Sequence, residues 1–378
     1  MNNDDFDQEL AGEEAEEYAD RQRKDEPAPA LSPEEFAAWR SPREGSSNPM
    51  PLDNPLWHWL VRTRWDAYNA NEIYAGPSSL GAGPMWCFQR FGKSETGLPD
   101  GRVVHIGGEH EDYYDPDFYI YNDVTVVGPS GHIAIHGYPV SVFPPTDSHS
   151  ATLVDGAVFI IGGLGYAERR VGGVTPVYKL LLDSMQIDPM ETHGEPPGWI
   201  YKHTATLADD GLSIIVSGGK CWVGDDLIGS ENIDSWSLDT LTGKWSRLTE
   251  HRWQRWVMRR VDCKRSRLWA ARQALWHSEH AHLGLERDWT FDDEPDFAAL
   301  KMLYRMEDDG EAPITELDFN CYAVVIDGLT IRFKEEGFWI EAIVEGRLDD
   351  DRLESLQRRT LSLLERIEAS ACEIVGAG

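Results

Sequence analysis

The residues best suited to bind a metal ion lie together at His277, Glu279, His280 and His282. Imidazole nitrogens and carboxylates are common protein ligands for zinc and related ions. In a strand, His280 and His282 would share one face, whereas in a helix His277 and His280 would share one. Because neither conformation puts all three histidines on one face, and no second ligand cluster stands out, we predict no metal site and no cofactor.

A second group of chemically active residues is the segment EHEDYYDPD at 109–117. It interleaves acidic side chains with tyrosines, a mixture that suits a basic protein surface or a cation. The simpler alternative is a solvated acidic loop in an acidic protein. The residues predicted to bind here are Glu109, Asp112, Tyr113, Tyr114 and Asp115.

The segment 251–272 has the opposite charge, with eight basic residues and one acidic residue. Trp253, Trp256 and Trp269 are interleaved with the arginines. This pattern could serve nucleic acid, where arginine binds phosphate and tryptophan stacks on bases. Strands that alternate buried tryptophan with exposed arginine are the stronger explanation. We therefore predict no nucleic-acid partner.

The composition of the whole chain supports that exclusion. The 378 residues include 35 Lys and Arg against 66 Asp and Glu, so the formal net charge is −31. Binding to nucleic acid depends on cationic contacts to phosphate, whereas an acidic protein attracts basic partners. The 15 Trp, 13 Tyr and 34 Gly indicate a β-rich fold with tight turns.

Cysteine usage and the apolar runs suggest the compartment. The 5 cysteines contain no CxxC pair, which favours reduced thiols over a disulfide framework. The first 20 residues lack the basic and apolar regions of a secretory signal. No apolar run approaches the roughly 18 residues of a membrane helix. We expect a soluble cytoplasmic protein with no membrane partner.

An internal repeat organises the middle of the chain. The segments GRVVHIGG, AVFIIGG and LSIIVSGG end in the pairs Gly107-Gly108, Gly162-Gly163 and Gly218-Gly219, which are 55 and 56 residues apart. HSATLVDG and HTATLADDG precede the second and third pairs. Each pair is followed by a loop and then by a strand bearing Tyr or Trp: YNDV, VYKLLLD and SWSLD. Such regular self-similarity is typical of repeat architectures.

These segments resemble the kelch repeat, in which each unit forms one four-stranded blade of a β-propeller. Glycine pairs would let backbones approach closely where the inner strands converge. Kelch propellers usually have about six or seven blades, whereas this chain has room for about five, so we expect a small or incomplete propeller. HIAIHGYPV (132–140) stands where the first tryptophan strand should be. We predict a degenerate fourth blade at 260–273 and a further sheet element in the aromatic-rich stretch 56–91.

The resemblance implies several possible activities, and the residues that each activity requires can be compared with this sequence. Nitrile-specifying kelch proteins use a Glu-xxx-Asp-xxx-His iron triad, but here Tyr119 follows Glu111 and Asp115. Copper oxidases similar to galactose oxidase form a secreted class, unlike this chain. Kelch-type sialic acid mutarotases use Arg and Glu around a sugar, and Glu168 with Arg169 could serve in this way.

The flanking regions define the expected domain organisation. We predict an acidic disordered tail over 1–30, a short helix and linker over 31–55, a kelch-like propeller over 56–285 and an α+β element over 286–378. Ser32 and Glu35 form a capping box with Pro33 in the first turn. CYAVVIDGLTIRF and EEGFWIEAIVEG predict a strand meander, followed by a long amphipathic helix that Asp351 and Glu354 cap.

We expect a mainly β protein whose function is non-catalytic protein binding, with an inhibitor or immunity protein of a basic toxin or effector as the more specific form. The alternative is a small-molecule enzyme of the sialic acid mutarotase type. Loops that leave equivalent strands of successive blades should emerge on one face, so all three should bind. Besides the residues of the first loop, the predicted contacts are Tyr166, Glu168, Arg169, Trp222, Asp225 and Asp226.

Overall fold

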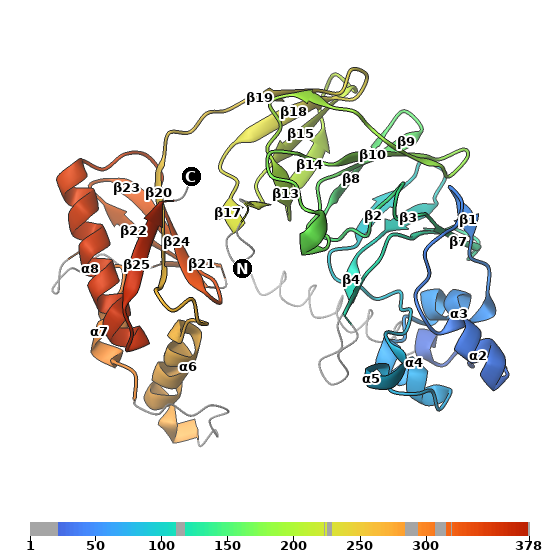
Figure 1. Ribbon diagram of the computed structural model, residues 1–378, viewed down its shortest axis with the longest axis horizontal. Helices are drawn as coiled ribbons and strands as arrows, with labels where there is room; N and C mark the ends of the chain where they lie inside the picture. Colours follow the sequence, from blue (N-terminus) through green and yellow to red (C-terminus); the bar gives the residue numbers. More distant parts are fainter. Residues whose placement is uncertain are drawn as a thin grey trace, which may run out of the picture. The chain divides into compact units, whose positions relative to one another are not determined.

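The computed structural model describes residues 22–110, 118–222, 224, 229–283, 294–306, 315–318 and 320–376. The chain divides into two compact units (Figure 1). Unit 1 comprises residues 1–224 and 231–249, and unit 2 comprises residues 225–230 and 250–378. The predicted mainly β fold is confirmed, because both units are built on antiparallel sheets.

Unit 1 contains three successive sheets, which we call the first, second and third repeat sheets because each carries one glycine pair. Their strand orders are β1-β7-β6-β3-β2, β11-β10-β9-β8 and β12-β19-β18-β15-β14. Within each sheet the neighbouring strands are antiparallel, except for the parallel pair β12 and β19. The bounds are β1 Met50–Pro51, β2 Ser94–Gly97, β3 Val103–Ile106, β6 Val124–Val127 and β7 Ile133–Gly137; β8 Ser150–Val154, β9 Ala157–Ile161, β10 Val177–Leu181 and β11 Ile187–Pro189; β12 His193–Gly194, β14 Thr204–Leu207, β15 Ser213–Ser217, β18 Ser235–Asp239 and β19 Lys244–Arg247.

The same turn precedes one edge strand of each repeat sheet. Gly92, Ser148 and Lys202 have φ angles of 62°, 55° and 54°, and they lie two residues before the edge strands β2, β8 and β14. The Ser148 amide donates to the Gly92 carbonyl at 2.7 Å, and the Lys202 amide donates to the Ser148 carbonyl at 2.8 Å. Successive sheets are therefore linked through equivalent backbone positions.

A side-chain bond repeats beside this turn. The Ser94 hydroxyl lies 2.8 Å from His149 Nε2, and the Ser150 hydroxyl lies 2.8 Å from His203 Nε2. In both cases the hydroxyl at the start of one sheet meets the histidine that precedes the next sheet. Both imidazoles are buried, and burial lowers the pKa of His149 to about 3 and that of His203 to about 4.

The glycine pairs lie where the chain crosses from one sheet to the next. The Gly108 amide donates to the Thr146 carbonyl at 2.9 Å, and the Gly163 amide donates to the Ile200 carbonyl at 2.9 Å. A Cβ on Gly107 would overlap the Thr146 carbonyl oxygen, and one on Gly162 would overlap the Ile200 carbonyl oxygen. A side chain is thus excluded because the backbones approach too closely.

The third repeat sheet ends the series. A Cβ on Gly218 would meet only the Thr204 hydroxyl, 4.0 Å away, because no segment crosses there among the residues that the structure describes. Trp236 and Leu238 are buried toward the second sheet, whereas the alternating residues point to the opposite side. That opposite side is rich in half-buried serine: Ser213, Ser217, Ser235, Ser237 and Ser246.

Apolar side chains from facing sheets form the cores of unit 1. Val104 and Val126 of the first sheet pack with Val158 and Ile160 of the second. The opposite face of the second sheet packs against the third through residues that include Phe159, Ile161, Ile214, Trp236 and Trp245. The other face of the first sheet is covered by helices.

These helices correct the prediction of a sheet element at 56–91. Asn54 caps α3 by accepting a hydrogen bond from the Trp57 amide at 2.8 Å, and Pro55 occupies the first turn. The capping signals therefore outweigh the aromatic composition that suggested strands. The predicted helix at Ser32 is confirmed, with both bonds of its capping box present. The bounds are α2 Pro33–Trp39, α3 Pro55–Thr63, α4 Ala67–Ile73 and α5 Ser79–Ala82.

The N-terminal part of the described chain contacts the same helices. Trp59 Nε1 donates to the Glu26 carbonyl at 3.1 Å, and Arg62 pairs with the Glu26 carboxylate at 2.8 Å. The Tyr74 hydroxyl donates to the Pro29 carbonyl at 2.8 Å. Residues 1–21 of the predicted acidic tail lie outside the described residues.

Unit 2 is one six-stranded sheet, ordered β21-β22-β23-β24-β20-β25, with helices packed on one face. The predicted meander is confirmed as β22 to β24, and the predicted long helix is confirmed as α8. Asp349, and not Asp351, caps that helix. The bounds are β20 Gln254–Arg260, β21 Thr315–Asp318, β22 Cys321–Ile326, β23 Leu329–Glu335, β24 Trp339–Val344 and β25 Cys372–Gly376, with α6 Leu268–Glu279, η2 Ala281–Leu283, α7 Phe297–Met302 and α8 Asp350–Glu368; β17 Gly229–Glu231 straddles the division between the units.

The degenerate fourth repeat predicted at 260–273 is wrong. β20 ends at Arg260 and pairs with β24 and β25 of unit 2. Residues 268–273 begin helix α6, because LWAARQ consists largely of strong helix formers. No helix in the described part of the chain is long and apolar enough to span a bilayer.

The second glycine of a pair generates the first prediction, because Gly163 and Gly219 each lie against the segment that enters their own sheet. Gly163→Val and Gly219→Val should each lower the free energy of unfolding by more than about 2 kcal/mol, because both residues have left-handed φ angles and lie against neighbouring backbone. Gly172→Val is the matched control, since nothing lies within 4 Å of its added Cβ. Thermal and denaturant melts of the full chain measure the effect. Equal midpoints for all three variants would contradict these close contacts.

The buried histidines generate the second prediction. An unfolded histidine titrates near 6.5, whereas His203 in the folded chain has a pKa of about 4. Between these values the unfolded state binds more protons, so stability falls as the pH drops from about 6.5 to about 4. His203→Gln should flatten this slope by up to about 1.4 kcal/mol per pH unit. Denaturant melts across this range test it, with the exposed His193→Gln as control; identical slopes in both variants would refute it.

Candidate functional site

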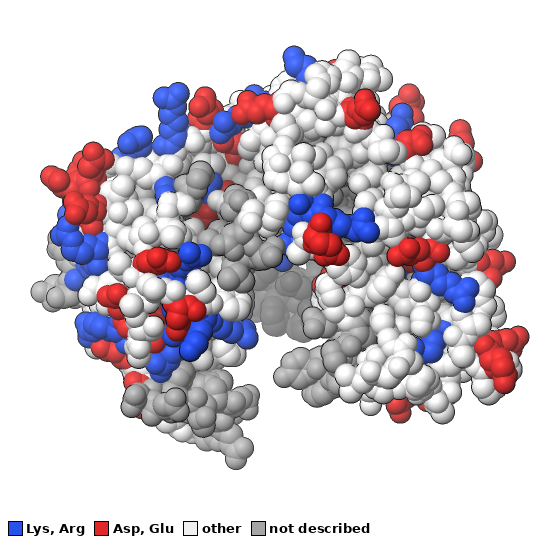
Figure 2. Space-filling model, in the orientation of Figure 1, with Lys and Arg blue, Asp and Glu red and all other residues white. Residues whose placement is uncertain are grey.

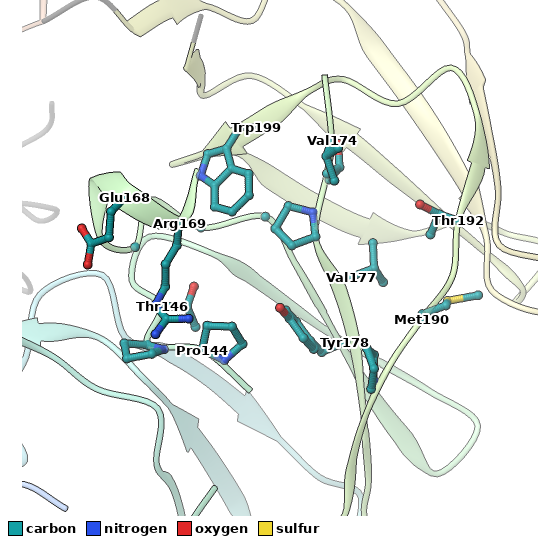
Figure 3. A pocket seen from close by; sticks show the side chains of 17 residues that line it. Pro144, Thr146, Glu168, Arg169, Val174, Val177, Tyr178, Met190, Thr192 and Trp199 are labelled. Carbon is teal, nitrogen blue, oxygen red and sulfur yellow. The ribbon is translucent and has the colours of Figure 1, made fainter. Parts of the chain in front are cut away.

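A cavity of about 660 Å³ opens beside the second repeat sheet of unit 1 (Figure 3). It lies where the segment between the first two sheets, the loop after Gly163 and strands β10 and β11 come together. Its lining residues include Pro144, Pro145, Thr146, Gly163, Glu168, Arg169, Val174, Val177, Tyr178, Pro189, Met190, Thr192 and Trp199.

Arg169 supplies the cationic group of this pocket. It ends the short helix η1 (Ala167–Arg169), and its guanidinium extends into the cavity beside Thr146 (Figure 3). The neighbouring Arg170 holds the loop in place by donating to the Leu164 and Gly165 carbonyls at 3.1 and 3.0 Å. The Arg169 side chain makes no hydrogen bond or ion pair with any residue that the structure describes, so its donors are available to a ligand.

Tyr178 supplies a hydroxyl to the same cavity. Its ring packs on Phe143, with the ring centroids 5.2 Å apart, and its hydroxyl turns into the pocket (Figure 3). Burial raises the pKa of Tyr178, and the positive charge of Arg169 opposes part of that rise. The hydroxyl is therefore protonated at neutral pH and can donate a hydrogen bond to a ligand held by Arg169.

The remaining walls are mainly apolar. Trp199 is held at the rim by a hydrogen bond from its Nε1 to the Leu164 carbonyl at 3.2 Å. Proline residues form much of the rest, and Val177 and Met190 complete it. An apolar cavity with a few polar groups is the usual form of a binding pocket.

Residues near the pocket contact parts of the other loops that were predicted to bind. The Tyr166 hydroxyl accepts a hydrogen bond from the Ile120 amide at 3.0 Å, which joins the second loop to the small sheet of β4 (Glu109–His110) and β5 (Tyr119–Ile120). Glu109 pairs within that sheet. Trp222 of β16 (Lys220–Trp222) lies opposite Trp199 of β13 (Trp199–Tyr201). One residue from the third loop thus neighbours the pocket rim.

Other predicted residues contribute differently. Glu168 lines the pocket, but its carboxylate points away from Arg169 (Figure 3). Asp112, Tyr113, Tyr114, Asp115, Asp225 and Asp226 lie outside the described residues. Sequence reasoning missed Thr146, Tyr178 and Trp199, because these come from separate segments. The tyrosine in VYKLLLD was a visible signal, since that strand belongs to the repeat.

The basic segment 251–272 and the histidine cluster, which were the other candidate sites, contain residues that contact other side chains of the chain. In the basic segment, Arg255 pairs with Glu341 at 2.5 Å and Arg259 pairs with Glu373 at 3.0 Å. His280 stacks on Trp276 at a centroid distance of 4.5 Å. Among the residues that the structure describes, no group of three or more His, Cys, Asp or Glu side chains is arranged to hold a metal ion.

Comparisons with known proteins give a structural likeness that is distant in sequence. No family model and no curated protein matches the chain. A solved structure titled "Structure of YjhT" is similar at 16% sequence identity and a TM-score of 0.29, over 44% of this chain and 53% of that one. The match spans about half of that structure's length.

Proposed function

We propose that unit 1 is an open, kelch-like array of three blades that binds another protein, and that the pocket of the second repeat sheet anchors the partner. The kelch assignment is supported by the glycine pairs, the left-handed turns and the serine–histidine bonds, which recur at equivalent positions. Rigid repeated sheets of this kind can hold loops for recognition.

The observation that carries the proposal is that the Arg169 guanidinium and the Tyr178 hydroxyl line the same cavity, inside mainly apolar walls. The Arg169 guanidinium has no partner among the described residues, although the chain carries 66 acidic side chains. An inserted partner side chain would bury apolar surface against Trp199 and the prolines. Its nearest carbonyl or carboxylate would accept hydrogen bonds from Arg169 and Tyr178.

The mutarotase alternative requires Arg and Glu to face one sugar. Both residue types line the pocket, but the Glu168 carboxylate is directed away from the Arg169 guanidinium (Figure 3). This arrangement supports binding over acid–base chemistry at one ligand. Incubation with a library of reducing sugars, followed by nuclear magnetic resonance, tests the alternative: accelerated anomer exchange that Arg169→Ala abolishes would favour the enzyme.

The third prediction tests the pocket directly. A partner recovered from the native host should bind Arg169→Ala and Trp222→Ala about 10- to 100-fold more weakly than the parent, as expected for interface anchors. Calorimetry with the purified partner measures the loss. Arg102→Ala is the matched control, because Arg102 is a partly exposed arginine of unit 1 that pairs with Asp100 at 2.7 Å.

A second control separates the two charged regions. Arg259→Ala alters the basic segment of unit 2 and should leave the affinity unchanged. The proposal is wrong if Arg169→Ala and Trp222→Ala bind normally while Arg259→Ala does not bind. In that case the partner binds unit 2. Unchanged melting temperatures must accompany each comparison.

The fourth prediction concerns the charge of the partner. The net charge of −31 supports a basic partner, such as a toxin or effector that this protein would inhibit. Figure 2 shows acidic and basic side chains interspersed on the visible face, so steering would come from the whole charge and not from one patch. The association rate should fall at least tenfold between about 50 and 500 mM salt. A salt-independent rate in stopped-flow measurements would refute the electrostatic part of the proposal.

A further inference from the structure

Helix α6 of unit 2 has two apolar sides. Leu268, Ala271 and Ala274 are buried in the core of the unit. Trp269 and Trp276, two helical turns apart, are 49% and 42% exposed, and His280 stacks on the Trp276 ring at a centroid distance of 4.5 Å. Isolated exposed apolar residues are common on protein surfaces, whereas apolar residues gathered around one groove are a feature of ligand sites.

The two tryptophans border a groove of about 440 Å³. This volume lies in the range of small-molecule sites. All of its lining residues belong to unit 2. They are Trp269, Arg272, Gln273, Leu275, Trp276, Glu279, Asn320 and Tyr322.

Each charged residue of the groove already has a partner of opposite charge. Arg272 pairs with the buried Glu335 at 2.5 Å, and its guanidinium lies 4.1 Å from the centre of the Tyr322 ring. Tyr304 also donates to Glu335, at 2.7 Å. Glu279 pairs with Lys301 at 2.8 Å. A charged ligand would gain little here, because it would have to displace an existing ion pair.

The polar groups left for a ligand are two primary amides. The Gln273 and Asn320 side chains have no hydrogen-bond partner among the residues described in unit 2. Each amide offers an acceptor and two donors. The groove therefore combines indole surface with groups that both donate and accept hydrogen bonds.

We propose that this groove binds the ring of an uncharged sugar. The C–H face of a pyranose packs on indole, and its neighbouring hydroxyls present the donor and acceptor pairs that Gln273 and Asn320 match. A nucleotide is disfavoured because Glu279 would repel its phosphate and both nearby cations are paired. The site lies in unit 2 and is independent of the function proposed for unit 1.

The experiment uses the full chain and saturation-transfer nuclear magnetic resonance. The probes are methyl glycosides of glucose, galactose, mannose and N-acetylglucosamine, with adenosine and AMP for comparison. At least one glycoside should bind, and its affinity should be unchanged between about 50 and 500 mM salt because no charge is recognised. Trp269→Ala and Gln273→Leu should each weaken that binding at least tenfold.

Two control variants locate the signal. Phe338→Ala removes another partly exposed aromatic side chain of unit 2, and Arg169→Ala alters the pocket of unit 1; neither should change glycoside binding. The proposal is overturned if no glycoside binds, if adenosine or AMP binds where the glycosides do not, or if binding survives in both groove variants. Retained melting temperatures show that a loss of binding is not a loss of folding.

Discussion

The close crossing of two backbones at the first and second glycine pairs is the constraint on which unit 1 depends. The carbonyls of Thr146 and Ile200 lie where side chains of Gly107 and Gly162 would otherwise project. The same carbonyls accept the amides of the following glycines, so the crossing excludes a side chain and satisfies a buried hydrogen bond at once. This fixes how the segment entering each sheet meets the previous sheet, and the left-handed turn and the serine–histidine bond lie a few residues further along.

The binding pocket is a consequence of that crossing. Thr146 accepts the Gly108 amide through its backbone and also lines the pocket. Next to it, the Asp147 carboxylate accepts a hydrogen bond from the Gly165 amide at 3.0 Å, which ties the loop after Gly163 to the entering segment. Arg169 lies at the end of this loop, so its position depends on the geometry of the sheets below it.

How far the sequence predicts the structure depends on whether each feature is local. The glycine repeat was visible because only glycine satisfies the crossing, and the caps of α2 and the meander were visible because each is set by adjacent residues. Helix α3 was missed because its tryptophans suggested strands, although Asn54 and Pro55 were a local signal. Of the pocket, only the loop after Gly163 could be predicted from the sequence. Thr146, Tyr178 and Trp199 could not, because they come together through tertiary packing.

The serine-rich far side of the third repeat sheet limits how such an array can grow by gene duplication. A tandem copy of this repeat would stack on the old one and bury Ser217, Ser235 and Ser237 without assured partners. Each buried hydroxyl left unpaired costs on the order of 1–3 kcal/mol. Lengthening at this end would therefore require the serines to become apolar together with the duplication, whereas a copy inserted between the first two sheets would meet apolar surfaces on both sides.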